Sequence, residues 1–186
     1  MEKKRIWLFV PAALIPYFSL GVMAFIFSMG RVPASSWIME HLFNDNIFYF
    51  VLVFLVYLLV ATVLGVICFV KSIREKWEPV SLAKTVMWIK LIQIPAYVAI
   101  YVLGVVMAIT LFTIPFAFVL FLLDCLAVAM TGLMNLSAVI GAYREGKTTL
   151  KKSWWVIVLQ GIFCADVVAS VIFYRMLKKQ DQQMAA

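Results

Sequence analysis

Long apolar stretches separated by short polar segments make up most of this 186-residue chain. Five stretches are long enough and poor enough in charge to cross a bilayer, since about 20 apolar residues span its hydrocarbon core as a helix. None shows the alternating pattern of a membrane β-strand, and a lipid-exposed backbone must satisfy its own hydrogen bonds, so we expect helices. The predicted spans cover about residues 6–30, 47–70, 91–112, 116–142 and 154–174.

The fold class predicted from this pattern is all-α, a single membrane domain over 1–186 built as a bundle of five transmembrane helices. Shorter stretches at about 35–43 and 81–90 are predicted to lie along the membrane surface as interfacial helices. Pro11 and Pro16 predict a kink in the first span, because each removes a backbone hydrogen bond. The apolar core of that span exceeds the roughly 7–15 residues of a cleaved signal peptide, so we expect it to be retained.

Composition supports a membrane location. The chain is 66% hydrophobic and 13% charged, whereas a soluble domain of this size has about 25% charged residues. Its net charge of +7 comes from short basic blocks between the apolar stretches. We interpret these blocks as topology signals that contact membrane lipids, and we expect no nucleic acid partner.

Counting the basic residues predicts the orientation. A cytoplasmic N-terminus places 12 of the 16 Lys and Arg inside, as the positive-inside rule requires: Lys3, Lys4, Arg5, Lys71, Arg74, Lys76, Lys84, Lys90, Arg144, Lys147, Lys151 and Lys152. The basic tail, with Arg175, Lys178 and Lys179, then falls outside. If the last segment were re-entrant, the tail would return to the cytoplasm and agree better with the rule.

Signatures of chemistry are scarce. The stretch from Gly141 to Thr148 matches the pattern of a nucleotide-binding P-loop, but that loop needs a preceding strand, and this one ends a predicted membrane helix. His41 is the sole histidine; it leaves too few ligands for a metal site and too few partners for a Ser or Cys nucleophile. We therefore expect no nucleotide, no metal, no cofactor and no enzymatic activity.

Two acids within the predicted spans are the main candidates for function. Asp124 and Asp166 must face protein or water, because a charge at mid-membrane costs at least about 2.5–3.5 kcal/mol. If the last two spans pack side by side, the two carboxyls approach one another. The candidate polar cluster comprises Asp124, Asp166, Tyr97, Tyr101, Asn135 and Thr131.

Two interpretations of this cluster remain open. In the first, the polar side chains hold helices together, aided by the small residues Gly161, Ala165 and Ala169, and the chain is an accessory protein that binds a partner, a lipid or further copies of itself. In the second, the acids bind protons or a cation in a small transporter or channel subunit.

The C-terminal half carries a resemblance. The segments Phe121-Leu-Leu-Asp-Cys125, Gly141-Ala-Tyr-Arg-Glu-Gly-Lys147 and Ile162-Phe-Cys-Ala-Asp-Val-Val-Ala-Ser170 resemble those of small multi-pass membrane proteins of Firmicutes-type bacteria. That family has no established activity. The resemblance implies a bacterial cytoplasmic membrane and implies nothing about chemistry.

Overall fold

The computed structural model describes residues 7–29, 31–109, 113–160 and 165–185, and the elements within them are all helical. A 3-10 turn, η1 (Trp7–Phe9), leads into the short helices α2 (Val10–Ala13) and α3 (Ile15–Ser28). The remaining helices are α4 (Pro33–Phe43), α5 (Ile47–Arg74), α6 (Pro79–Ala108), α7 (Ile114–Arg144), α8 (Leu150–Leu159) and α9 (Ala165–Ala185).

Three of these helices, α5, α6 and α7, are long and apolar enough to cross a membrane. The segments Trp7–Ala13 and Ile15–Ser28 also qualify as a pair, with a bend of 43° between them. This bend confirms the kink predicted from Pro11 and Pro16. The protein is therefore a helical membrane protein with three long apolar helices and a bent fourth segment, and these overlap the first four stretches predicted as spans.

Helix α6 differs from the prediction. The sequence predicted a surface helix at 81–90 followed by a span at 91–112, but one continuous helix runs from Pro79 to Ala108. Pro79 is its first residue, where a backbone N–H would have no partner within the helix, so the N–H that proline lacks costs nothing. Pro95 lies inside it without ending it. The polar first turns were misread as a separate element, and Lys90 is consequently an interior residue of a long helix.

The fifth predicted span, 154–174, is divided between two helices in the structure. Helix α8 ends at Leu159 and α9 begins at Ala165, and the two pack against one another. The Lys147 ammonium, just before α8, lies 2.6 Å from the Asp181 carboxylate near the end of α9. At the other end, Gln160 and Asp166 both contact Lys90. These contacts make α8 and α9 an antiparallel pair, which we call the C-terminal hairpin.

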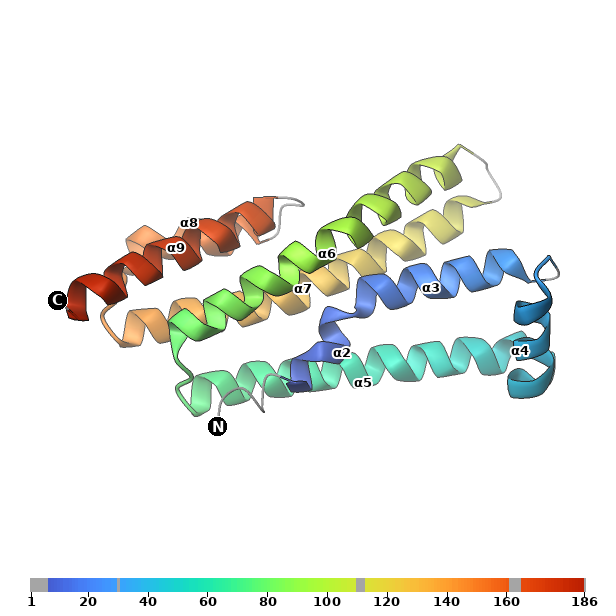
Figure 1. Cartoon of the computed structure of the whole chain (residues 1–186), viewed down its shortest axis with the longest axis horizontal. Coiled ribbons are helices and arrows are strands. Elements are labelled where there is room, and N and C mark those ends of the chain that lie inside the picture. Colours follow the sequence, from blue (N-terminus) through green and yellow to red (C-terminus); the bar gives the residue numbers. More distant parts are fainter. Residues whose placement is uncertain (1–6, 30, 110–112, 161–164, 186) are drawn as a thin grey trace.

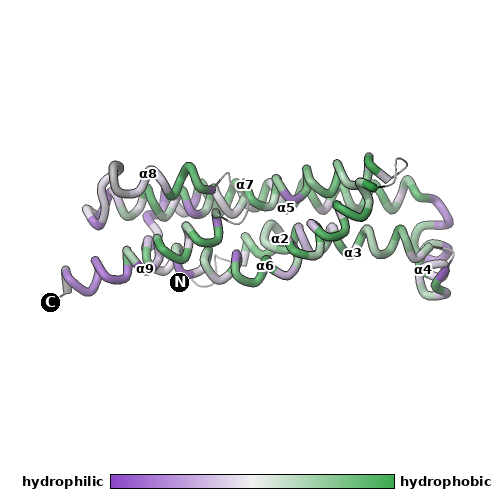
Figure 2. Tube along the Cα trace, turned by 90° about the horizontal axis from the view of Figure 1, so that it is seen from above, coloured by the Kyte–Doolittle hydropathy of each residue, from purple (hydrophilic) through white to green (hydrophobic). Residues whose placement is uncertain are grey.

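The helices lie nearly along one long axis, with α6 and α7 in the middle, α3 and α5 on one side and the C-terminal hairpin on the other (Figure 1). At one end α5 and α7 finish, α6 begins and α9 terminates; we call this the basic end. Helix α4 crosses the opposite end (Figure 1). Apolar residues fill the middle of the long helices, polar ones gather in the C-terminal part of α9, and α4 is mixed (Figure 2).

The hairpin covers only the half of the bundle nearest the basic end. Helix α8 has 10 residues and α7 has 31, which correspond to about 15 Å and 46 Å at 1.5 Å per residue. The described ends of the hairpin, at Gln160 and Asp166, therefore meet α6 partway along its length.

Candidate functional site

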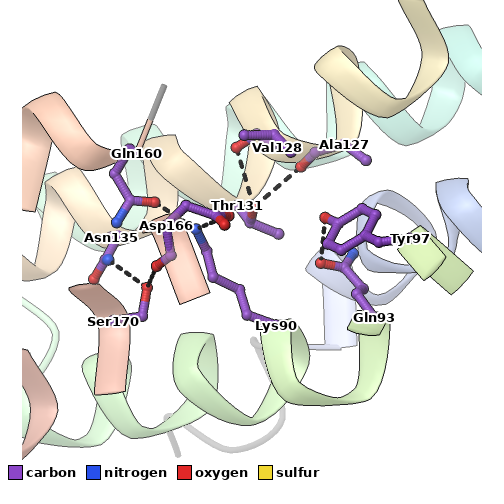
Figure 3. A network of polar contacts seen from close by, with 10 residues as sticks. All are labelled: Lys90, Gln93, Tyr97, Ala127, Val128, Thr131, Asn135, Gln160, Asp166 and Ser170. Carbon is purple, nitrogen blue, oxygen red and sulfur yellow. Dashed lines mark hydrogen bonds and ion pairs between the residues drawn. The ribbon is translucent and has the colours of Figure 1, made fainter. Parts of the chain in front are cut away.

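Lys90 is at the centre of the polar interior. It lies 11 residues after Pro79, about 16 Å along α6, and its side chain is fully buried. The Nζ atom donates a hydrogen bond of 2.7 Å to Asp166 Oδ2 and a second to Gln160 Oε1 (Figure 3). Both members of the ion pair are shielded from solvent, since the side chain of Asp166 is also only 1% exposed.

The two partners of Lys90 come from opposite arms of the C-terminal hairpin. Gln160 directly follows the last residue of α8, and Asp166 is the second residue of α9. One ammonium therefore bonds to both helices where they meet α6. Asp166 also lies in the first turn of its helix, where the helix dipole stabilises a negative charge.

A second set of bonds joins α9 to α7. The Asn135 side chain donates a 2.9 Å hydrogen bond to Ser170 Oγ, and Ser170 Oγ donates a 2.7 Å bond to the backbone carbonyl of Asp166 (Figure 3). All three residues are buried. Together with Lys90 and Gln160 they form what we call the hairpin cluster.

A third set extends toward the N-terminal helices. The Tyr97 hydroxyl donates to Gln93 Oε1 at 2.9 Å, and Gln93 Nε2 donates to the carbonyl of Ala13 at 2.7 Å. Gln93 is buried and lies less than one turn beyond Lys90. The polar face of α6 thus contacts α9 at Lys90 and the end of α2 at Gln93.

Asp124 lies apart from these bonds. It is ten residues into α7, about 15 Å from Ile114, and is 3% exposed. Its Oδ1 atom is buried and has no hydrogen-bond partner among the described residues. Asp124 interacts electrostatically with Asp166, but the direct partner of Asp166 is Lys90. The expected acid pair is therefore replaced by an ion pair with a second acid nearby.

The other predicted site residues divide into two groups. Tyr97 and Asn135 join the buried bonds, whereas the partners of Thr131 among the described residues are the carbonyls of Ala127 and Val128 in its own helix. Tyr101 is 71% exposed, so its assignment to the cluster was wrong. Gly161 of the proposed small-residue ridge lies outside the described residues.

The sequence analysis did not assign Lys90 to the polar interior. Its position on one helical face with Gln93 and Tyr97 was visible, but it was counted as a cytoplasmic topology residue because the span was predicted to begin after it. A helix starting at Pro79 would have placed it three turns deep.

No family model, curated protein or solved structure matches this chain. The resemblance to small Firmicutes-type membrane proteins stays a prediction, and the function is inferred from the geometry of the polar interior.

Proposed function

We propose that the chain is a non-enzymatic accessory protein of the bacterial cytoplasmic membrane, which binds membrane lipid or a partner protein and moves no solute. The supporting observation is the complete burial of the Lys90–Asp166 ion pair. Its two side chains are 0% and 1% exposed, and the ammonium is bonded to both arms of the C-terminal hairpin. A pair used in this way holds a re-entrant hairpin in place.

A re-entrant segment is compatible with lipid only where protein covers its non-helical backbone. In this chain α6 and α7 pack against α8 and α9, and the hairpin cluster supplies hydrogen bonds at the described ends of both helices. The proposed architecture is thus four spans and one re-entrant hairpin in place of five spans.

The basic residues support a cytoplasmic N-terminus. The contact of Lys147 with Asp181 brings the tail, with its basic residues, to the end where α5 and α7 finish. Arg31 lies between α3 and α4, at the opposite end of the bundle. With the tail on the same side as the other basic blocks, its basic residues no longer depart from the positive-inside rule, as they do with five spans.

A second candidate is a proton- or cation-coupled transporter or channel subunit. Asp124 favours it, because an ionised Asp124 adds a negative charge to an interior where Lys90 is already paired with Asp166. A buried carboxylate in lipid costs several kcal/mol unless a proton or cation joins it. In a transporter, that proton or cation is the transported species.

Proton flux into proteoliposomes separates the two candidates. Vesicles containing a pH-sensitive dye are driven by a potassium diffusion potential, with wild type, Asp124→Asn and Asp166→Asn compared with protein-free vesicles. The accessory role predicts that all three match the protein-free rate. A wild-type flux that Asp124→Asn abolishes, and that the matched control Asp45→Asn in the α4–α5 connection retains, would establish transport instead.

A further inference from the structure

A cavity of about 400 Å³ opens at the basic end, between the last turns of α5 and α7. Lys76 and Arg144 line it from two sides, the buried hydroxyls of Ser72 and Ser137 line it on α5 and α7, and Trp77 borders it. Its place where two apolar helices end puts it at the level of the lipid headgroups, where tryptophan is enriched.

Two basic side chains, Lys76 and Arg144, face the cavity. Among the described residues, neither Lys76 nor Arg144 forms an ion pair with a carboxylate. Glu145 also lines the cavity, but its carboxylate is 3.0 Å from the Lys147 ammonium. Two positive charges are therefore available to a ligand.

The C-terminal ends of α5 and α7 at the cavity repel an anion less than their helix dipoles suggest. A helix C-terminus carries partial negative charge on its free carbonyls. Here two carbonyls in the last turn of α5 are already bonded: Ser72 O accepts from the Trp77 amide at 3.1 Å, and Ile73 O accepts from Arg144 Nη1 at 3.0 Å. This bond also fixes the Arg144 guanidinium at the cavity and leaves its other N–H groups for a ligand.

Lys76 occupies a backbone position that favours glycine. The bond from Trp77 to Ser72 closes a Schellman motif, in which the residue after the C-cap adopts a left-handed conformation. Helix α7 ends in the same way with Gly146 at φ 70°, but α5 uses Lys76 at φ 50°. A non-glycine residue held in this conformation stores strain, which is typical of functional sites.

We propose that this cavity binds the phosphate of an anionic phospholipid headgroup through Lys76 and Arg144. The inference rests on the proposed accessory role and names its lipid ligand. A basic cavity between membrane helices on the cytoplasmic side fits such a headgroup, and the glycerol and acyl chains can continue along the exposed apolar face of α5.

Native mass spectrometry of the purified protein with added phosphatidylglycerol or phosphatidylcholine tests the proposal. We expect wild type to retain phosphatidylglycerol in preference, and Lys76→Gln and Arg144→Gln each to lower retention about five-fold. Lys71→Gln removes the same charge from an exposed position of α5 outside the cavity, so it should change retention by less than about two-fold.

Lys76→Gly separates binding from folding. Glycine relieves the left-handed strain, so this variant should keep or raise the unfolding temperature while losing phosphatidylglycerol retention as Lys76→Gln does. Retention equal to wild type in Lys76→Gly, or an equal loss in Lys71→Gln, would overturn the site.

Inorganic phosphate at millimolar concentration distinguishes the source of the anion. Undiminished retention of phosphatidylglycerol supports the lipid, whereas its full displacement would make a soluble phosphate the ligand and refute the lipid assignment. These readouts are independent of proton flux, so the lipid site can fail while the accessory role stands, and the reverse.

Discussion

Lys90 shows how a charged side chain is accommodated deep in this bundle. An ammonium can donate three hydrogen bonds, and two of them reach Gln160, just after α8, and Asp166 in α9. The desolvation of such a pair is expensive, so its net contribution to stability is small. Loss of one partner is costly, because the remaining charge stays buried without compensation.

Lys90→Met is therefore expected to lower the free energy of unfolding by about 3–5 kcal/mol. The change removes the ammonium that pairs with Asp166 and leaves a buried carboxylate behind. Thermal unfolding in detergent measures it. The matched control is Lys84→Met, on the exposed face of the same helix, which should shift stability by less than about 0.5 kcal/mol.

The double variant Lys90→Met/Asp166→Leu should recover most of the stability lost by Lys90→Met. With both charges gone, no unpaired ion stays in the interior, and apolar replacements of buried ion pairs are often neutral. A double variant as unstable as Lys90→Met alone would show that the loss comes from packing and not from the unpaired charge.

At the level of residues, the sequence predicted correctly that the two acids are buried, but it did not predict which side chains contact one another. The acids Asp124 and Asp166 are buried as expected from the cost of a charge in lipid. Tyr101 shares a helical face with Lys90, yet it lies 11 residues farther, about 16 Å along α6. The C-terminal hairpin begins its return near Lys90, so it does not cover Tyr101. Periodicity gives the face of a helix but not the length of its neighbour.

At the scale of elements, α5 and α7 approach closely at Gly65. A Cβ atom at this position would lie 3.1 Å from Met130 Sδ and 3.4 Å from Ala12 Cβ. Small residues allow such close packing of membrane helices, where dispersion contacts are the main driving force.

Gly65→Leu should destabilise the bundle by about 1–3 kcal/mol, because the larger side chain must displace α7 or α2. Gly104→Leu is the matched control, since a Cβ there meets nothing within 4 Å. Chemical unfolding of the two variants in the same detergent compares them. Equal losses would contradict the close crossing at Gly65.

The hairpin has a second attachment at its water-exposed end. A hydrogen bond from Lys147 to Asp181 raises the pKa of Lys147, with Glu145 adding to the effect. The contribution of this contact is therefore fully present below the ordinary lysine pKa of about 10.4 and is lost as the pH rises through the raised value.

Lys147→Met should accelerate hydrogen exchange in the last turns of α9, since it removes the partner of Asp181. The effect on global stability should stay under about 1 kcal/mol, as for other ion pairs near the surface, since the Asp181 side chain is 44% exposed. Exchange should remain unchanged near Asp166, where Lys90 still holds the helix. Faster exchange throughout α9 would mean that the hairpin depends on the outer contact.

Element prediction was accurate where length and hydropathy decide, as for α5 and α7. It did not predict the division of 154–174 into α8 and α9, because two arrangements share one hydropathy profile. An apolar stretch of about 20 residues fits either one span or a re-entrant pair, and the choice here depends on contacts from Lys90 and Asp181 to distant residues. No local pattern contains that information.

At the scale of the whole molecule, the proposed re-entrant architecture places the tail on the same side of the membrane as Lys147. A fifth span would place Lys178 and Lys179 opposite the other basic blocks. In the proposed architecture the hairpin returns them to the side of Lys147, where Lys147 contacts Asp181, and the ends of the bundle then differ in charge as the positive-inside rule requires.

The most direct test is the sidedness of single cysteines in a variant without native cysteines. Positions 45, 147 and 183 are each labelled in intact cells and in inverted vesicles with a membrane-impermeant maleimide. We expect 147 and 183 to react only in inverted vesicles and 45 only in intact cells. Labelling of 183 from the same side as 45 would contradict the re-entrant hairpin and restore a fifth span.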